Sequence, residues 1–429
     1  MRTRRIRRRT RNHKFRNVKK NRTRGLVKRG GGKSVRNRKW IKRRQAVKRG
    51  GVPPNQFPRE INVTKIDGTI VTLGTQSTNV GNITGATGAG TVYTDSYNKY
   101  YVKVMTADET QHQPPSHIKR IFSIEVEILK HLNTTYNDSK YFPKYLGSME
   151  PQLQNAEPLW AIATEILPNA NYADLLTNYV YAKTKFANVA KQLCEGLSLL
   201  HTAGVYHRDI KLENVVIDTN TGQIMYIDFN GCYNEELYTK LEDIFTADNK
   251  PIDKLGHDGT PTYRHPEIVS IAQSTNFTEF GKIENLPKYD YWALAQLLYS
   301  LNYDNTSAFE TLYSIPQNQG EEMRMLTYFA DMESIKNYTI NPNIHNGKFK
   351  ATYKTVYNNI QKLDTQLRTY GCWTFTDLMN ASDVKTSITL TWPHTPVVAP
   401  AKPTIIGSLR NSFAAVRNKI LGNPNKPEN

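Results

Sequence analysis

The sequence predicts an α+β fold in which a part with short strands precedes a part that is mainly helical. In the first part, runs at 100–104 and 159–167 are rich in apolar, β-branched or aromatic residues, the composition of strands. In the second part, apolar residues of 185–202 recur at spacings of three and four, which is typical of a helix with one buried face. With 429 residues, the chain is long enough for one large or two medium domains with a substantial core.

The excess of positive over negative charge lies entirely in the first fifty residues. The formal net charge is +19, yet residues 1–50 contain 24 Lys and Arg and no Asp or Glu, so the remainder carries −5. We expect 1–51 to be a disordered basic arm, because such a block repels itself and buries no core. Its charge favours nucleic acid as the partner of residues 1–50. A nuclear-import signal, docking on an acidic protein and a purely solvating tail are the alternatives.

The three cysteines and the hydropathy pattern indicate where the protein resides. Cys194, Cys232 and Cys372 are odd in number and form no metal-ligand pair, which favours a reducing compartment. The sequence contains no apolar run of the ~20 residues that a transmembrane helix needs. We therefore expect an intracellular protein, in the cytoplasm or nucleus, without a transmembrane segment. The sequence gives no indication of its oligomeric state.

A glycine-rich segment follows a linker. Residues 52–77 open with prolines, and from residue 61 apolar and polar side chains alternate weakly. This pattern favours a linker followed by strands that extend the strand-rich first part of the chain. The next segment contains Gly85, Gly88, Gly90 and Val92. Glycines let the backbone approach phosphate oxygens closely, so that exposed amide groups bind them. The alternative interpretation is a Thr/Gly hairpin without a ligand.

A lysine and a glutamate in the first part are expected to form a buried pair. Lys103 lies between two valines of a predicted strand. Glu125 lies in the middle of the apolar stripe of a helix predicted over 117–132, whereas Glu127 points elsewhere. A carboxylate on a buried face needs a cationic partner, because its desolvation is costly. Lys103 is the obvious candidate.

The most informative stretch runs from His207 to Asn214, and a predicted hairpin follows it. The strands Val215–Asp218 and Ile224–Ile227 flank a turn, so antiparallel pairing brings Asn214 beside Asp228. Two oxygen ligands at one end of a hairpin suit magnesium. An ordinary surface hairpin with polar ends is the alternative.

The stretch 207–214 matches H-R-D-x-K-x-x-N, the catalytic loop of protein kinases, at every fixed position. Other segments fit in the same order, namely Gly85–Val92, Tyr100–Val104, Asp228–Gly231, Gly259–Glu267 and Asp290–Ala295. The chain resembles the eukaryotic-type protein kinase superfamily, and within it a serine/threonine kinase. Its divergent motifs and basic arm are similar to those of kinases from large DNA viruses.

The resemblance implies a two-lobed protein-kinase-like fold, with a small β-rich N-lobe and a larger α-helical C-lobe. The kinase domain would span 78–380, with the N-lobe at about 78–165 and the C-lobe at about 166–380. Residues 381–429 would form a Pro-containing linker and a basic tail.

The resemblance also implies the cofactors ATP and Mg²⁺, protein substrates and a role for each site residue. Asp209 would accept the proton of the acceptor hydroxyl, Lys211 would stabilise the transferring phosphoryl group, and Asn214 and Asp228 would bind magnesium. Lys103, oriented by Glu125, would hold the α- and β-phosphates. Phosphates would also bind the segment with Gly85, Gly88, Gly90 and Val92, and the backbone of Glu165 to Leu167 would receive adenine.

Two departures from the family pattern favour a rival interpretation. Thr87 replaces the middle glycine of the glycine-rich loop, and Asn230 replaces the glycine of the D-F-G motif, where it is expected to tolerate positive φ. The rival is a catalytically weak or inactive kinase-fold protein that binds or packages nucleic acid through its basic arm. The chain retains four residues that a scaffold does not need, which opposes the rival: Lys103, Asp209, Asn214 and Asp228.

Overall fold

The computed structural model describes one of the two units into which the chain divides. These units are Met1–Lys48 and Arg49–Asn429, and all described residues belong to the second. The described residues are 60–74, 90–95, 99–107, 115–151, 158–166, 170–241, 263, 265, 286–303, 351–382, 388–392 and 395–398. The predictions for the arm at 1–51, for the linker up to residue 59 and for the tail after 398 lie outside them.

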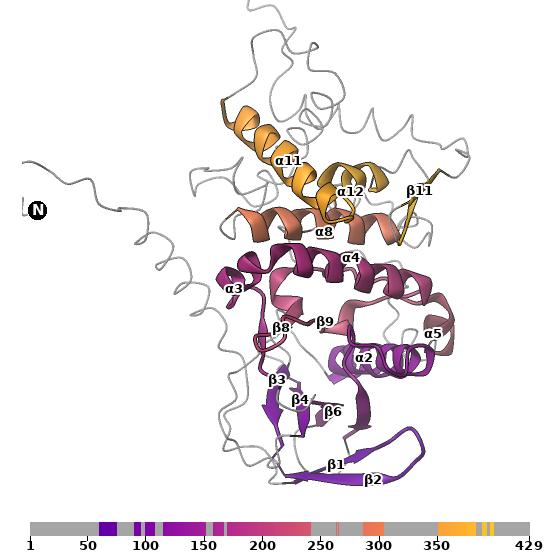
Figure 1. Ribbon diagram of the computed structural model, residues 1–429. Helices are drawn as coiled ribbons and strands as arrows, with labels where there is room; N and C mark the ends of the chain where they lie inside the picture. Colours follow the sequence, from indigo (N-terminus) through magenta and orange to yellow (C-terminus); the bar gives the residue numbers. More distant parts are fainter. Residues whose placement is uncertain are drawn as a thin grey trace, which may run out of the picture. The chain divides into compact units, whose positions relative to one another are not determined.

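The first lobe is an antiparallel sheet with one helix on a face. Its strands are β1 (Glu60–Thr64), β2 (Ile70–Gly74), β3 (Gly90–Thr94), β4 (Tyr100–Thr106), β5 (Tyr145–Met149) and β6 (Leu159–Glu165). They are ordered β2-β1-β5-β6-β4-β3. Helix α2 (Pro115–Thr135) packs against β4, β5 and β6 (Figure 1). This arrangement agrees with the strand predicted at 100–104 and with the predicted helix, and the strand predicted at 159–167 is present up to Glu165.

Both faces of this sheet are covered, which decides where Lys103 points. Side chains of a strand alternate between the two faces of the sheet. Val102 and Val104 are buried in an apolar cluster with Ala161 and Ala163, whereas Met105 is buried in the cluster that contains α2. Lys103 shares the face of Met105, so it points toward α2 and away from the valines on either side.

The β1–β2 hairpin, which precedes the segments that resemble kinase motifs, extends the sheet. Strands β1 and β2 pair from Glu60↔Gly74 to Thr64↔Ile70, and β1 reaches β5 at Thr64↔Ser148. Apolar side chains of the hairpin join the cluster on the face opposite α2. The predicted strands after residue 61 are thus confirmed up to Gly74, and the rest of that prediction lies outside the described residues.

The second lobe begins with a small sheet and the helix that leads into the 207–214 stretch. Strands β7 (Tyr172–Asp174), β8 (Val215–Asp218) and β9 (Ile224–Tyr226) pair antiparallel, as predicted for the hairpin. Shorter helices here are α3 (Tyr179–Thr184), η3 (Leu212–Asn214), η4 (Phe229–Gly231) and α5 (Glu235–Lys240). Helix α4 (Phe186–Thr202) confirms the predicted helix, and the chain turns after it at Gly204, whose φ is +69°.

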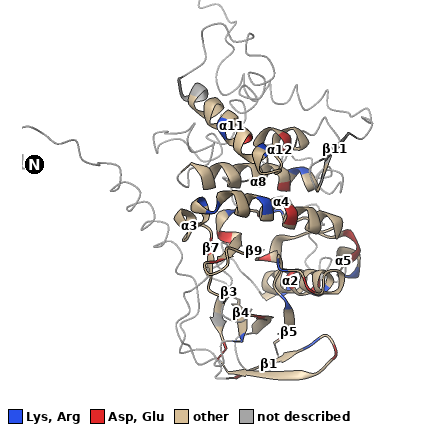
Figure 2. Ribbon diagram, in the orientation of Figure 1, with Lys and Arg blue, Asp and Glu red and all other residues tan. Residues whose placement is uncertain are grey.

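The remaining helices form layers against α4. Helix α8 (Leu286–Asn302) contacts α4 and α12 (Phe375–Ala381), and α11 (Ala351–Thr369) contacts α4, α8 and α12 (Figure 1). A last pair of strands, β10 (Ile388–Thr391) and β11 (Thr395–Val398), follows. Helix α8 is buried along most of its length and has two charged residues, Lys288 and Asp290, near its start (Figure 2). Among the described helices, none is long and apolar enough to cross a membrane.

Candidate active site

The 207–214 loop is held by a buried aspartate of α8. Asp290 is fully buried, and its carboxylate accepts the backbone N–H groups of His207 at 2.8 Å and Arg208 at 2.7 Å. The same carboxylate lies 2.9 Å from Nε2 of His201, on α4. Arg208 has φ +64°, a left-handed conformation that is unfavourable for a side chain with a Cβ. The bonds to Asp290 fix the backbone that leads into this strained residue.

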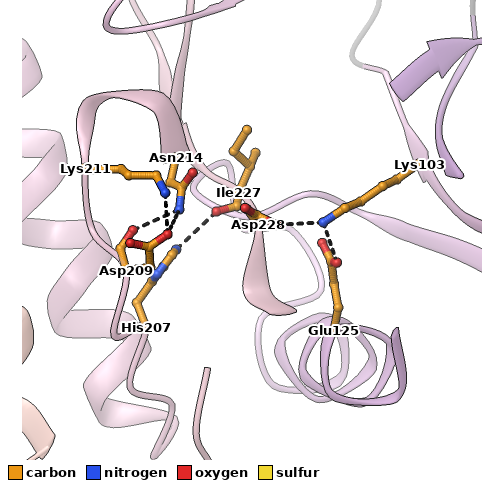
Figure 3. A network of polar contacts seen from close by, with 8 residues as sticks. All are labelled: Lys103, Glu125, His207, Asp209, Lys211, Asn214, Ile227 and Asp228. Carbon is orange, nitrogen blue, oxygen red and sulfur yellow. Dashed lines mark hydrogen bonds and ion pairs between the residues drawn. The ribbon is translucent and has the colours of Figure 1, made fainter. Parts of the chain in front are cut away.

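Within the loop, three polar side chains form a local cluster (Figure 3). Lys211 Nζ lies 2.5 Å from Oδ2 of Asp209, and Asn214 Nδ2 donates to the same oxygen at 2.9 Å. Asn214 Nδ2 also donates to the backbone carbonyl of Asp209 at 2.9 Å. We call Asp209, Lys211 and Asn214 the loop cluster. Its amide and amine hold the Asp209 carboxylate in one orientation.

The hairpin brings the end of this loop beside Asp228. Val215 pairs with Tyr226, and the N–H of Ile227 donates to the carbonyl of Asn214 at 3.0 Å. His207 Nε2 lies 3.1 Å from the carbonyl of Ile227, so the loop also grips the residue before Asp228. The structure therefore places Asn214 and Asp228 at the same end of the hairpin, as predicted.

The left-handed residue of the 228–231 segment differs from the expectation. The sequence suggested positive φ at Asn230, but among the described non-glycine residues only Arg208 and Asp228 have it, Asp228 with φ +66°. Asn230 is instead buried inside the short helix η4. The left-handed residue thus lies two positions earlier, directly before Phe229, whose ring centroid is 5.4 Å from that of His207.

Lys103 joins three separate elements in a second cluster (Figure 3). Its Nζ lies 2.7 Å from Oε2 of Glu125 and 2.6 Å from Oδ1 of Asp228. Its side chain is 15% exposed, and those of Glu125 and Asp228 are 6% and 5% exposed. We call Lys103, Glu125 and Asp228 the bridging cluster, since its members come from β4, α2 and the end of the hairpin. The pair expected between Lys103 and Glu125 is present.

The bridging cluster sets the charge states of its members. Burial disfavours the charged amine of Lys103, but the two carboxylates outweigh it and raise the pKa of Lys103. For Asp228, burial is outweighed by Lys103, so its pKa is lowered. For Glu125, burial prevails over the attraction of Lys103, and the pKa is raised.

Two oxygen atoms at the meeting point of the clusters fit a divalent cation. Asn214 Oδ1 and Asp228 Oδ2 are buried, and neither has a hydrogen-bond partner among the described residues. Buried polar atoms are rarely left unpaired without a reason. Carboxylate and amide oxygens are ligands that magnesium prefers, and it usually takes only one or two protein ligands beside phosphates and water. Within the described part of the chain there is no group of three or more His, Cys, Asp or Glu that could hold a metal ion.

A cavity between the six-stranded sheet and the β8–β9 hairpin is lined by the bridging cluster. Its lining combines charged residues with apolar and aromatic ones. They are Val92, Tyr101, Lys103, Glu125, Leu129, Pro143, Ile162, Thr164, Glu165, Tyr172, Val216, Met225, Ile227, Asp228 and Phe229. The cavity can thus accept a ligand with a polar part and a planar apolar part.

The structure describes only some of the residues predicted to bind ATP. Gly85, Gly88 and Leu167 lie outside the described residues. Gly90 begins β3, and Val92 lines the cavity opposite Lys103 in the register of β3 and β4. Glu165 ends β6 and lines the cavity, but its N–H donates to the carbonyl of Lys144 and its side chain pairs with Lys144 Nζ at 3.4 Å. The amide of Glu165 is therefore already occupied.

Sequence reasoning missed two tyrosines in the cavity wall. Tyr101 precedes Lys103 by two residues, so strand alternation alone would have placed both side chains on one face. Tyr172 had no such signal, because its place depends on the pairing of β7 with β8.

Comparison with known proteins agrees with this geometry. The family described as protein kinase domain matches residues 78–379. The serine/threonine-protein kinase CST20 of Candida albicans is 29% identical over 184 residues, which is 40% of this chain and 13% of that protein. The probable serine/threonine-protein kinase mkcD of Dictyostelium discoideum is 27% identical over 218 residues, 50% of this chain and 28% of that protein. STE20 of Saccharomyces cerevisiae is 28% identical over 185 residues, 40% and 17% of the two chains. The matches thus cover less than a third of each of these relatives.

Proposed function

Because the chain belongs to the protein kinase family, we propose that it transfers the γ-phosphoryl group of ATP to Ser or Thr hydroxyl groups of protein substrates. The observation that carries this proposal is the meeting of the two clusters. One hairpin links the loop cluster to the bridging cluster. Asn214 Oδ1 and Asp228 Oδ2, which have no hydrogen-bond partner in the part of the chain that the structure describes, lie where the clusters meet. An inactive scaffold would have no need to bury unpaired oxygens at that point.

The loop cluster would act on the acceptor. Asp209 would orient the substrate hydroxyl and accept its proton as the oxygen attacks the γ-phosphorus. Lys211, fixed 2.5 Å from Asp209, would stabilise the negative charge of the transferring group. Asn214 would keep the Asp209 carboxylate in place through its amide.

The bridging cluster would position the nucleotide. Asn214 Oδ1 and Asp228 Oδ2 would hold magnesium, which neutralises charge on the phosphates. Lys103 would bind the α- and β-phosphates, and Glu125 would keep its amine directed into the cavity.

Two observations support Ser and Thr as acceptors. The first is that Lys211 in the loop and Thr260 in the Gly259–Glu267 segment match the residues that serine/threonine kinases have at these motif positions. The relatives named above carry serine/threonine kinase in their names.

Transfer of label from ATP tests the proposal. Wild-type protein with Mg²⁺ is expected to label an acidic or basic test protein, and Asp209→Asn should lower the rate by about 10²–10⁴-fold. Asp67→Asn, in the exposed turn between β1 and β2, is the matched control and should leave the rate unchanged. Equal incorporation by wild type and Asp209→Asn would reject the enzyme and favour the nucleic-acid-binding scaffold.

We further propose that residues 1–50 contact nucleic acid, which suits a protein of the cytoplasm or nucleus. The charge of this segment, +24, supports binding to phosphates with strong salt dependence. Deletion of 1–50 should abolish salt-sensitive retention of DNA and RNA while phosphoryl transfer stays largely intact. Unchanged retention by the truncated chain would refute this role.

A further inference from the structure

The β1–β2 hairpin forms one border of the six-stranded sheet, and its outer strand has an open edge. Strand β2 is first in the strand order, and no strand among the described residues pairs with its outer side (Figure 1). Backbone groups along an open edge can pair with another strand, and natural proteins usually protect such an edge with a charge, a proline or a bulge. The sequence of β2, Ile-Val-Thr-Leu-Gly, contains no charge and no proline, and its register with β1 is regular.

The hairpin turn determines which residues of β2 direct their backbone groups outward. The N–H of Lys65 donates to the carbonyl of Thr69 at 2.9 Å, so these two residues form a hydrogen-bonded pair within the hairpin. Hydrogen-bonded and non-hydrogen-bonded pairs alternate along two antiparallel strands. In the register of β1 and β2, the N–H and C=O groups of three residues therefore point away from β1: Ile70, Thr72 and Gly74.

The side chains of β2 with outward-directed backbone groups lie on the exposed face of the hairpin. The side chain of Ile70 is 69% exposed and Thr72 is also exposed, whereas Leu73 is buried in the cluster on the face opposite α2. Ile66, in the turn of the same hairpin, is 62% exposed. Contact of Ile70 with a strand on the open edge would remove this apolar surface from water.

We propose that β2 pairs antiparallel with β2 of a second copy of the chain, so that the two sheets become one. The outward-directed residues are spaced symmetrically about Thr72, so a two-fold axis places Thr72 opposite its own copy and Ile70 opposite Gly74. Each facing pair then exchanges both of its hydrogen bonds, and every outward N–H and C=O group of β2 gains a partner. Two threonines that face each other stabilise a strand pair, and Gly74 has no side chain to oppose Ile70.

The composition of the edge favours a second copy, and its size sets the strength of the association. Since β2 has no ionisable side chain, its pairing with itself opposes no like charges. Two short strands bury less area than a typical stable interface, so the dissociation constant should be roughly 10–100 μM. The hairpin contains no residue of the loop cluster or the bridging cluster, so the pairing is independent of the proposed function.

Sedimentation velocity of the nuclease-treated full chain measures this pairing. Wild type should change from monomer to dimer between about 5 and 500 μM. The dimer should persist at about 0.5 M salt, because its hydrogen bonds do not depend on charge, whereas association through nucleic acid and residues 1–50 would be lost.

Charges placed at the two-fold axis test the register. Thr72→Lys and Thr72→Glu each bring two like charges opposite each other and should weaken the dimer about fivefold or more. The comparison is made at about 0.15 M salt, where neighbouring charges still repel. An equimolar mixture of the two variants places Lys opposite Glu and should dimerise within about twofold of wild type.

The matched control is Asn62→Lys, on the neighbouring strand. Asn62 pairs with Thr72 in the register and accepts its hydroxyl group at 2.7 Å. The control thus loses the same hydrogen bond and gains the same charge as Thr72→Lys, but one strand further from the axis. It should dimerise within about twofold of wild type, because the added charges are screened at that separation. Thermal unfolding of each variant checks that the fold is kept.

Four results would overturn the inference while the proposed function stands. Wild type that stays monomeric up to about 500 μM would show that the edge does not pair. Loss of the wild-type dimer at high salt would assign the association to charged contacts. A dimer that Thr72→Lys leaves unchanged would lie elsewhere on the molecule. Failure of the mixed variants to dimerise would contradict the pairing of Thr72 with its own copy.

Discussion

The bridging cluster joins residues from three elements far apart in the sequence, whereas the loop cluster is built within six consecutive residues. Lys103 meets Glu125 and Asp228 only because β4, α2 and the hairpin are packed together. Asp209, Lys211 and Asn214 are brought together by the turn of one loop and the short helix η3. The first cluster therefore reports on the packing of the lobes, and the second on the conformation of one segment.

The difference matters for energetics. A buried charge that loses its partner is costly, because it can neither return to water nor find another ion. In the bridging cluster two buried carboxylates share one amine, so both lose their cationic partner if Lys103 is removed. The loop cluster instead depends on Asp290, which holds the backbone below it.

Removal of Lys103 should break the bridging cluster and have the largest effect on stability. Lys103→Met leaves Glu125 and Asp228 buried without a cation, so the free energy of unfolding should fall by about 3 kcal/mol. The matched control is Lys130→Met, whose partner Glu127 lies on the same helix but in a partly exposed pair at 2.8 Å. It should cost about 0.5 kcal/mol or less. Urea denaturation measures both, and equal losses would show that the bridging cluster is not a buried unit.

Removal of Asp290 should disturb the loop cluster, because Asp290 holds the backbone directly before Asp209. Asp290→Ala leaves the N–H groups of His207 and Arg208 buried without an acceptor and the positive φ of Arg208 without support. The free energy of unfolding should fall by about 2 kcal/mol, and the rate of phosphoryl transfer should fall with it. Asp67→Ala is the control, because Asp67 also accepts two hydrogen bonds but lies in an exposed turn. A stable variant with full activity would contradict the support assigned to Asp290.

The pH dependence of Lys103→Met sharpens the comparison further. Burial already raises the pKa of Glu125, and loss of the Lys103 amine removes the charge that opposes this rise. A carboxyl group with a raised pKa in the folded state stabilises the fold when protonated, so its contribution is lost as pH rises through that value. The destabilisation of Lys103→Met should thus be smaller at pH 5 than at pH 8, by about 1 kcal/mol. Lys130→Met should show no such trend, and the same loss at both pH values for Lys103→Met would contradict the burial of Glu125.

The sequence predicted the local parts of the site well, because they depend on spacing. The 207–214 motif, the hairpin after it and the position of Glu125 on a buried helical stripe are all readable from neighbouring residues. The contact between Lys103 and Glu125 followed from one physical argument, that a buried carboxylate needs a cation.

Other features depended on packing between distant segments. Positive φ falls on Asp228 rather than Asn230, beside a Phe229 ring that packs against His207, and residue preferences alone do not show this. The contact of β1 with β5 and the place of Tyr172 in the cavity likewise depend on pairing between strands far apart in the sequence. Such pairings leave no periodic signal in a single chain.

Binding of Mn²⁺, in place of Mg²⁺, tests most directly whether the two clusters share one metal and one nucleotide. Electron paramagnetic resonance would follow Mn²⁺ binding in the presence of a non-hydrolysable ATP analogue. Asn214→Ala, from the loop cluster, and Asp228→Asn, from the bridging cluster, should each weaken binding about tenfold or more, and Asp67→Asn should leave it unchanged. Retention of wild-type Mn²⁺ affinity by either site variant would contradict a shared metal site.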